Sequence, residues 1–359
     1  MRKEQISESQ VYILIITFMI GTTTAISPFI ESRQNTWISL LLALVFATPI
    51  VIIYGSIANR HPNKDIFQIF EYVFGKIIGK IIGVFYTFYF LHLGAICIRN
   101  MSEFIHIASF PETPQYFTVL FIGILAIYIL KAGLEVMARV NKFMFPFLIF
   151  VIGLTIVFVF PRAHITHFLP ILEDGWEPVL KTGHLMSTFP FGETVAFLAF
   201  FNAVNEKKKA SKIYLKGIYL GALILFGVIV RNILVLGPAN LASNILPSFE
   251  AVSLINIGNF IRGTEIIIAI VITIAGFIKV SVCLLASSIG ISRLFGFDDY
   301  KWVCAPLGLL MMSLSFILYN NAMRMLEWVN IYKFYVIPFQ LIIPIFVLIF
   351  GGLRRRTAN

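Results

Sequence analysis

The chain has 359 residues, of which 58% are hydrophobic and only 13% are charged. Soluble domains carry about a quarter charged residues, so this composition excludes a water-soluble enzyme with one ordinary core. A formal net charge of +10 would suit a nucleic-acid partner, but the basic residues lie in short segments between apolar runs, which indicates membrane topology instead. The sequence therefore predicts an all-α integral membrane protein, with residues 1–359 forming a single transmembrane domain.

Ten apolar runs long enough to span a bilayer follow one another along the chain. Between the second and third, the stretch KDIFQIFEYVFGK predicts a short amphipathic helix at the membrane surface. Two longer segments, 161–182 and 238–263, are either ordinary loops or short helices folded back over an outward-facing cavity. The predicted spans are 10–31, 36–58, 76–107, 115–131, 133–160, 183–205, 211–238, 263–292, 302–320 and 334–352.

Lysine and arginine are distributed unequally between the two sides of these spans. With a cytoplasmic N-terminus, the cytoplasmic side holds 19 of the 28 Lys and Arg residues, the opposite side holds 6, and 3 fall within spans. Because cytoplasmic loops are enriched in Lys and Arg, this asymmetry predicts that both termini are cytoplasmic. The polar N-terminus lacks a small-residue cleavage pattern, so the first span is expected to be an uncleaved anchor.

Two spans contain helix-breaking sequences at matching positions. The first is interrupted by Gly21-Thr-Thr-Thr-Ala-Ile-Ser-Pro28, and the sixth by Ser187-Thr-Phe-Pro-Phe-Gly-Glu-Thr194. Gly and Pro cost a helix about 1 to 3 kcal/mol each, and unpaired backbone in hydrocarbon is tolerated only against protein or a wet cavity. Thr22 and Phe191 are 169 residues apart, close to half the chain. The alternatives are unrelated kinks or an inverted five-plus-five repeat, over about 10–160 and 183–352, with its binding site at the breaks.

Such a site suits a small zwitterion, because half-helix ends offer both free N–H groups and free carbonyls. Glycines at the breaks would allow close approach, threonines would add hydroxyl groups, and aromatic rings would enclose a side chain. The predicted ligand-binding residues are Gly21, Thr22, Thr23, Thr24, Tyr86, Tyr89, Phe189, Phe191, Gly192 and Glu193.

Ionisable residues within spans are costly and are therefore candidates for function. Glu193 would pair with a ligand ammonium or sense pH, or would simply cap the following half-helix. In sodium-coupled transporters built on such a repeat, this part of helix eight helps to hold a cation against helix one. A buried Lys279 ammonium would take the place of that cation and hold the two helices together, or Lys279 would snorkel to the cytoplasmic surface. Arg99 and Glu103 are spaced to form a structural ion pair, and Arg231 is expected to reach the outer surface.

No cofactor or metal is expected. Cys97, Cys283 and Cys304 lie in apolar surroundings, without the spacing of a metal site or disulfide framework, so they are interpreted as packing residues. The sequence contains no Ser/His/Asp set, HExxH motif or P-loop, which argues against an enzyme.

The opening ISESQVYILIITFMIGTTTAISP resembles the first helix of spore germinant-receptor B subunits, the GerAB-type spore germination permeases of the amino acid–polyamine–organocation superfamily. The segment HFLPILEDGWEPVLKTG, the following FPFGE, the Lys-rich inner loop and the ten-span layout are also similar. The resemblance implies a leucine-transporter-like fold in the inner membrane of a spore. It also implies a small germinant, commonly an amino acid, bound where broken helices one and six meet, and partnership with an A subunit and a C-subunit lipoprotein. The first break is richer in Thr and poorer in Gly than in many amino acid permeases.

Three functions remain open at this stage. The first is a germinant sensor whose ligand shifts a conformational equilibrium that partner subunits detect. The second is a proton-coupled amino acid permease in which Glu193 or Lys279 titrates. The third is a scaffold whose ligand site is vestigial.

Overall fold

The structure is a computed structural model that describes residues 4–25, 27, 29–109, 111–205, 209–254, 264–319 and 321–357. These residues are almost entirely helical, and the one extended pairing among them is a parallel bridge between Ile6 and Val204. The elements are α1 (Glu8–Thr23), η1 (Ile30–Asn35), α2 (Thr36–Arg60), α3 (Ile66–Phe74), α4 (Lys76–Ala108), α5 (Gln115–Ala132), α6 (Leu134–Val159), η2 (Phe160–Arg162), η3 (Ile165–Phe168), α7 (Glu177–Met186), η4 (Ser187–Phe191), η5 (Gly192–Ala199), η6 (Phe201–Ala203), α8 (Ala210–Ser243), α9 (Pro247–Ser253), α10 (Thr264–Phe295), α11 (Lys301–Leu318), α12 (Ala322–Tyr335), η8 (Pro338–Ile342) and α13 (Ile343–Thr357).

Within the described residues, eight helices are long and apolar enough to cross a membrane. They correspond to all the predicted spans except the first and sixth, which are the two interrupted ones. The prediction of an all-α membrane protein with helices one and six interrupted is therefore confirmed.

The last span differs from its predicted limits of 334–352. It begins at Ala322 in α12, passes through the π-helical turn η8 and continues as α13. Residues 322–333 lie between the predicted ninth and tenth spans, in a stretch that contains Arg324, Glu327 and Lys333. These charges belong to one helix that also carries the buried side chains of Met325 and Tyr332.

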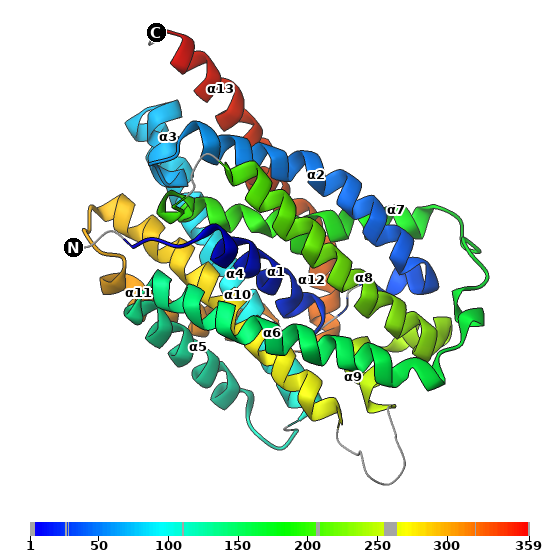
Figure 1. Cartoon of the computed structure of the whole chain (residues 1–359). Helices are drawn as coiled ribbons and strands as arrows, with labels where there is room; N and C mark the ends of the chain where they lie inside the picture. Colours follow the sequence, from blue (N-terminus) through cyan, green and yellow to red (C-terminus); the bar gives the residue numbers. More distant parts are fainter. Residues whose placement is uncertain are drawn as a thin grey trace.

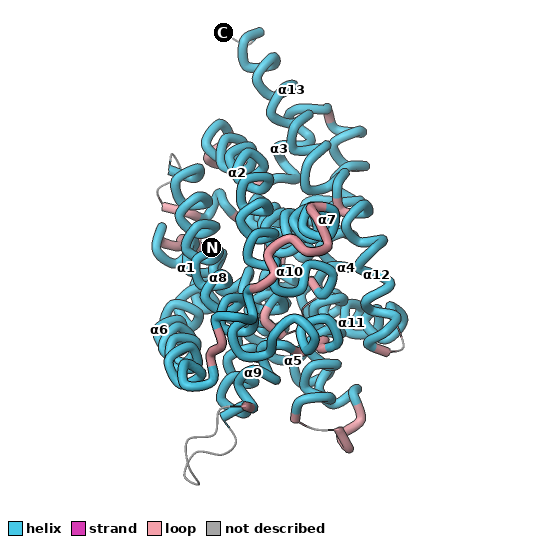
Figure 2. The backbone as a smooth tube through the Cα atoms, turned by 90° about the vertical axis from the view of Figure 1, so that its right-hand side faces the viewer, coloured by secondary structure: helices cyan, strands magenta, loops and turns pink. Residues whose placement is uncertain are grey.

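The centre of the bundle consists of α1, α4, α8 and α10, and the other spans pack around them (Figure 1). α1 and α10 approach closely because Gly21 has no side chain: a Cβ atom there would lie 2.7 Å from the carbonyl oxygen of Ala275. Phe143 and Phe150 of α6 and Tyr128 of α5 are exposed, and we assign these apolar surfaces to the lipid. The C-terminal helix α13 extends beyond the remaining helices (Figures 1 and 2).

One end of the bundle carries α3 and the N-terminal segment. The apolar face of α3 is buried against α4 rather than free to enter lipid, which refines the predicted surface helix. Asp65 caps α3 and forms an ion pair with Arg293 (2.8 Å). Burial raises the pKa of Asp65, and the charge of Arg293 opposes that rise. The N-terminal segment is held at the same end by Glu4, which pairs with Lys301 (3.1 Å).

The opposite end carries the two long connecting segments. The first forms η2, η3 and the start of α7, and the second forms α9, which packs on α8 and α10; residues 255–263 lie outside the described residues. Arg231 does not reach the outer surface as predicted. It is 2% exposed, and its guanidinium donates to Thr155 Oγ1 (2.7 Å) and Asn232 Oδ1 (2.8 Å). Neutral acceptors near its own helix satisfy the charge, so it has no need to extend to water.

Candidate functional site

The first break exposes the C-terminal end of α1 inside the protein. The helix runs through Gly21, Thr22 and Thr23, and Thr24 closes it by donating its backbone N–H to the carbonyl of Ile20 (3.2 Å). Gly21 to Thr23 therefore form the last helical turn, and the break follows them. The predicted break residues Ile26 and Pro28 lie outside the described residues. A helix C-terminus carries free carbonyls and the negative end of the dipole, so this end favours a cation.

The second break lies at Phe189, between α7 and η5. Its backbone is non-helical (φ −129°, ψ 110°), and Pro190 follows it, which removes one backbone donor. Glu193 sits in the first turn of η5, where the positive end of the helix favours a carboxylate. The two breaks lie side by side, with the rings of Phe29 and Phe189 6.2 Å apart.

A buried ion pair joins the two breaks to α10. The Lys279 ammonium donates to Glu193 Oε2 (2.5 Å) and to Thr22 Oγ1 (2.8 Å). Lys279 is 0% and Glu193 1% exposed, so neither charge reaches water. This excludes the snorkelling alternative for Lys279. The other oxygen of Glu193 accepts a hydrogen bond from the Tyr332 hydroxyl of α12. One network therefore connects four elements: α1, η5, α10 and α12.

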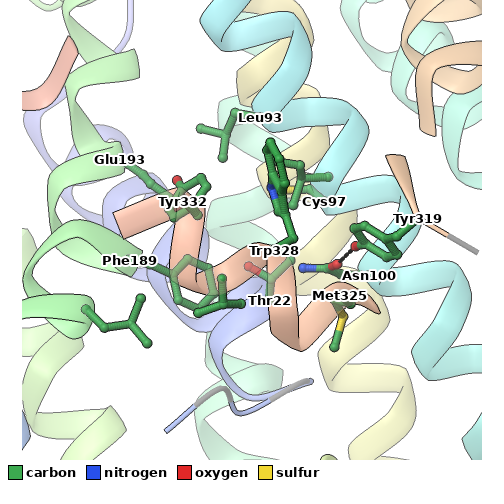
Figure 3. Close-up of a pocket in the computed structure, with 13 residues that line it drawn as sticks. Thr22, Leu93, Cys97, Asn100, Phe189, Glu193, Tyr319, Met325, Trp328 and Tyr332 are labelled. Atoms are coloured by element: carbon green, nitrogen blue, oxygen red, sulfur yellow. Dashed lines mark hydrogen bonds between the residues drawn. The ribbon is translucent and has the colours of Figure 1, made fainter. Parts of the chain in front are cut away.

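A small cavity of about 40 Å³ adjoins this network. Glu193, Thr22, Asn100 and Tyr332 supply polar groups, and the remaining wall is mostly apolar. Figure 3 shows Glu193, Tyr332 and Phe189 on one side and the hydrogen-bonded pair Asn100 and Tyr319 on the other. About 10–15 Å³ of such volume is needed for one water, so the cavity has room for only a few waters. A larger ligand would therefore require side chains to move. The full lining is Thr22, Leu93, Ile96, Cys97, Asn100, Leu185, Phe189, Glu193, Tyr319, Met325, Trp328, Val329 and Tyr332.

Among the predicted ligand-binding residues, Thr22, Phe189 and Glu193 line this cavity. Lys279 lies behind it, and its ammonium is within 4.6 Å of the Phe189 ring centre. Gly21, Thr23 and Thr24 are buried around the end of α1 without lining the cavity. Their role in binding stays a prediction.

Tyr86, Tyr89 and Gly192 contact the π-helical turn of the last span instead of the cavity. The Tyr86 hydroxyl donates to the carbonyl of Phe339 (2.5 Å), and Gln340 Nε2 donates to the Tyr89 hydroxyl (2.9 Å). Gly192 leaves room for Gln340, whose Oε1 would overlap a Cβ atom at position 192. The last predicted residue, Phe191, is fully buried in the core beside them. These residues position η8 against η5, one layer behind the cavity.

The last span supplies cavity residues that the sequence prediction missed. Met325, Trp328, Val329 and Tyr332 of α12 all line it. Their spacing of three and four residues is the signature of one helix face, but the charged residues between them obscured it.

The site places a carboxylate and an ammonium next to the cavity, where they are paired with each other. Within the described part of the chain, no cluster of three His, Cys, Asp or Glu side chains could hold a metal ion. A zwitterion inserted between Lys279 and Glu193 would meet an ammonium and a carboxylate, and the apolar wall would accept its side chain.

The sequence of the chain matches a known protein family. The chain matches the family described as "Spore germination protein" over residues 5–324. Spore germination protein KB of Bacillus subtilis (strain 168) is 27% identical over 99% of this chain and 97% of its own length. Spore germination protein XB of Bacillus anthracis is 24% identical over 74% of this chain and 76% of its own length.

Solved transporters share the fold at much lower identity. The structure of MhsT in complex with L-phenylalanine superposes with a TM-score of 0.68 at 15% identity, covering 98% of this chain and 99% of MhsT. A Na+-coupled sialic acid symporter gives a TM-score of 0.69 at 11% identity, covering 98% of this chain and 90% of the symporter. The all-helical architecture with two interrupted helices is thus a leucine-transporter-type fold. Because the family match extends over most of its length, the chain belongs to the spore germination protein family.

Proposed function

We propose that this chain is the germinant-binding B-type subunit of a spore germinant receptor. It binds a small germinant, an amino acid, between the broken helices one and six, and it passes the conformational change to an A subunit and a C-subunit lipoprotein. It resides in the inner membrane of the spore with both termini cytoplasmic. Family membership supports the role in germination, and the transporter-type fold supports a small-molecule site at the breaks.

The observation that carries the proposal is the buried pair of Lys279 and Glu193 beside the cavity. A ligand changes a conformational equilibrium only when it binds two states differently. An amino acid that places its ammonium on Glu193 and its carboxylate on Lys279 would separate the pair and reorganise all four elements that the network joins. The resulting state would differ at α1, η5, α10 and α12 together.

Thermal stabilisation of the purified full-length chain by a panel of amino acids tests the proposal. A ligand at one hundred times its Kd stabilises the folded protein against unfolding by about 2.7 kcal/mol, which a melting curve resolves. Glu193→Gln should abolish the ligand-induced shift. Glu103→Gln serves as the matched control, because Glu103 is also buried in an ion pair, with Arg99 (3.1 Å), but does not line the cavity. Equal ligand shifts in both variants would refute the site.

Spores provide the functional test. Deletion of the chain should remove the response to one germinant, and Glu193→Gln should reproduce that loss while the protein remains in the membrane. Unchanged germination across amino acids and sugars would refute the receptor role.

A proton-coupled amino acid permease is the second candidate. The observation that favours it is the carboxylate of Glu193 beside a transporter-type cavity, where protonation would release Lys279. Uptake of radiolabelled amino acids into proteoliposomes containing only this chain separates the two functions. Concentrative uptake driven by a pH gradient would favour the permease, and binding without uptake would favour the receptor.

A further inference from the structure

A groove of about 420 Å³ lies where α11 ends and α12 begins, on a different face of α12 from the cavity beside Glu193. Its volume is within the range of small-molecule binding sites, about 300–1,000 Å³. The α12 residues of the groove are spaced i, i+3, i+4 and i+7, which places them on one side of the helix. The groove is lined by Ile317, Leu318, Tyr319, Arg324, Glu327, Trp328 and Ile331.

This groove opens sideways, toward the perimeter of the bundle. Ile317 is 77% exposed and Ile331 is 55% exposed, and both belong to helices that are long and apolar enough to cross a membrane. Large apolar side chains on the outside of a membrane-spanning bundle contact lipid, because no water is available to them there. The natural occupant of the groove is therefore a molecule that reaches it from the bilayer.

The groove is polar at one end and apolar at the other. Arg324 and Glu327 lie in the first two turns of α12 and form an ion pair (2.9 Å), with side chains that are 69% and 65% exposed. Charged side chains near the end of a span reach the headgroup level of the membrane. Ile331 lies seven residues beyond Arg324, which is about 10 Å further along the helix. An exposed ion pair contributes little stability, so a headgroup can take over both charges at small cost.

We propose that this groove binds a phospholipid of the surrounding bilayer whose headgroup carries both a phosphate and a primary ammonium, as in phosphatidylethanolamine. The phosphate would accept hydrogen bonds from the Arg324 guanidinium, and the ammonium would donate to the Glu327 carboxylate. An acyl chain would lie along Ile331 and Ile317. Phosphatidylcholine has no N–H to donate to Glu327, and phosphatidylglycerol has no cation for it. The site does not depend on the proposed function, since a receptor and a permease would both carry it.

Two aromatic residues of the groove also line the cavity beside Glu193. These are Tyr319, whose hydroxyl donates to Asn100, and Trp328 (Figure 3). A lipid in the groove would contact these rings from the membrane side. The fluorescence of Trp328 can therefore report which lipid occupies the groove.

Contact quenching of Trp328 by brominated lipids tests the proposal. The full chain carries four tryptophans, and replacing Trp37, Trp176 and Trp302 by Phe leaves Trp328 as the only one. In nanodiscs of mixed lipid, brominated phosphatidylethanolamine should bind beside Trp328 about threefold to fivefold more tightly than brominated phosphatidylcholine, the range expected for exposed charges. Arg324→Gln and Glu327→Gln should each reduce this preference to less than about twofold.

Arg33→Gln is the matched control. Arg33 forms an exposed ion pair with Asp174 (3.5 Å; 48% and 49% exposed), and neither residue lines the groove. The preference should survive in this variant, and its loss there would reduce the effect to general surface charge and overturn the site. Equal quenching by the two brominated lipids in the parent protein would show an unselective lipid annulus and would also overturn it. Stronger quenching by brominated phosphatidylglycerol would overturn the assignment to a zwitterionic headgroup.

Native mass spectrometry of the unaltered chain provides an independent measurement that needs no tryptophan replacement. The wild type should retain phosphatidylethanolamine in preference to phosphatidylcholine, and Arg324→Gln should lose that preference while its melting temperature stays unchanged. Equal retention of the two lipids by the wild type would overturn the site whatever the fluorescence shows.

Discussion

The ion pair of Lys279 and Glu193 gives the most direct test of the buried network. Lys279→Met removes the ammonium and leaves a carboxylate that is 1% exposed, with its nearest cation gone. Breaking a buried pair from one side costs about 3–5 kcal/mol, because the remaining charge has neither water nor a partner. The Tyr332 hydroxyl still donates to Glu193 and offsets only part of this loss. We therefore expect a large destabilisation from the single change.

Removing both charges should behave differently. In Lys279→Met/Glu193→Met, no ion remains buried, and replacement of a buried pair by apolar side chains is often neutral or stabilising. For large domains, about 1 kcal/mol corresponds to roughly 2 °C in the melting temperature. The single variant should then melt roughly 6–10 °C below the wild type, and the double variant should recover most of that difference.

The assay is the melting temperature of purified protein, followed by intrinsic fluorescence for all four members of the double-mutant cycle. Lys333→Met is the control, because Lys333 is a lysine without an ion pair within the described residues, and its loss should leave the melting temperature unchanged. Additive losses in the double variant would show that the two side chains do not interact energetically. That result, or a Lys279→Met protein as stable as the wild type, would refute the reasoning.

Three further changes test the packing around the breaks by the same melting assay. Gly192→Val should destabilise the fold because its side chain overlaps Gln340, and Gln340→Ala in the same chain should restore much of the loss. Tyr54→Phe should cost about 1–3 kcal/mol, because a hydroxyl that donates to the buried carbonyl of Gln340 (2.5 Å) is removed; a change below 0.5 kcal/mol would contradict this. Gly21→Val should be far more damaging than Gly153→Val, since the first meets the backbone of α10 at 2.7 Å and the second has nothing within 4 Å. Equal melting temperatures of these two variants would rule out close backbone packing as the role of Gly21.

Much of the fold was predictable because membrane-spanning helices can be recognised from short stretches of sequence. Apolar length identified the spans, and Gly, Pro and clustered Thr marked the two breaks without reference to any other part of the chain. Glu193 and Lys279 were conspicuous for the same reason, since a charge within an apolar run has a high cost. Their mutual contact was not predictable, because they are 86 residues apart and meet only through tertiary packing.

The cavity residues that were not predicted lie on α12, where hydropathy and helical periodicity give conflicting predictions. On α12, Met325, Val329 and Tyr332 follow helical spacing, but Arg324 and Glu327 lower the hydropathy of the same stretch. Hydropathy therefore predicted a loop where periodicity indicates a helix with one buried face. Residue type suggested that Tyr86 and Tyr89 of α4 line the ligand site. In the structure, tertiary packing places their hydroxyls on the Phe339 carbonyl and the Gln340 side chain of η8, and their role in ligand binding stays a prediction.

The small volume of the cavity beside Lys279 and Glu193 places an energetic condition on the proposed sensor. Shifting a two-state equilibrium from 1:99 to 99:1 requires about 5.5 kcal/mol of preferential binding to one state. Apolar contact alone in a cavity of about 40 Å³ is a poor source of that difference, because little surface is available before the side chains move. Separation of Lys279 from Glu193 leaves two buried charges, each of which needs a partner in the new state. A zwitterion supplies both partners at once, whereas an amine or a carboxylic acid supplies one and leaves the other charge unpaired. The same pair that joins α1, η5 and α10 would thus make the response depend on both ends of the ligand.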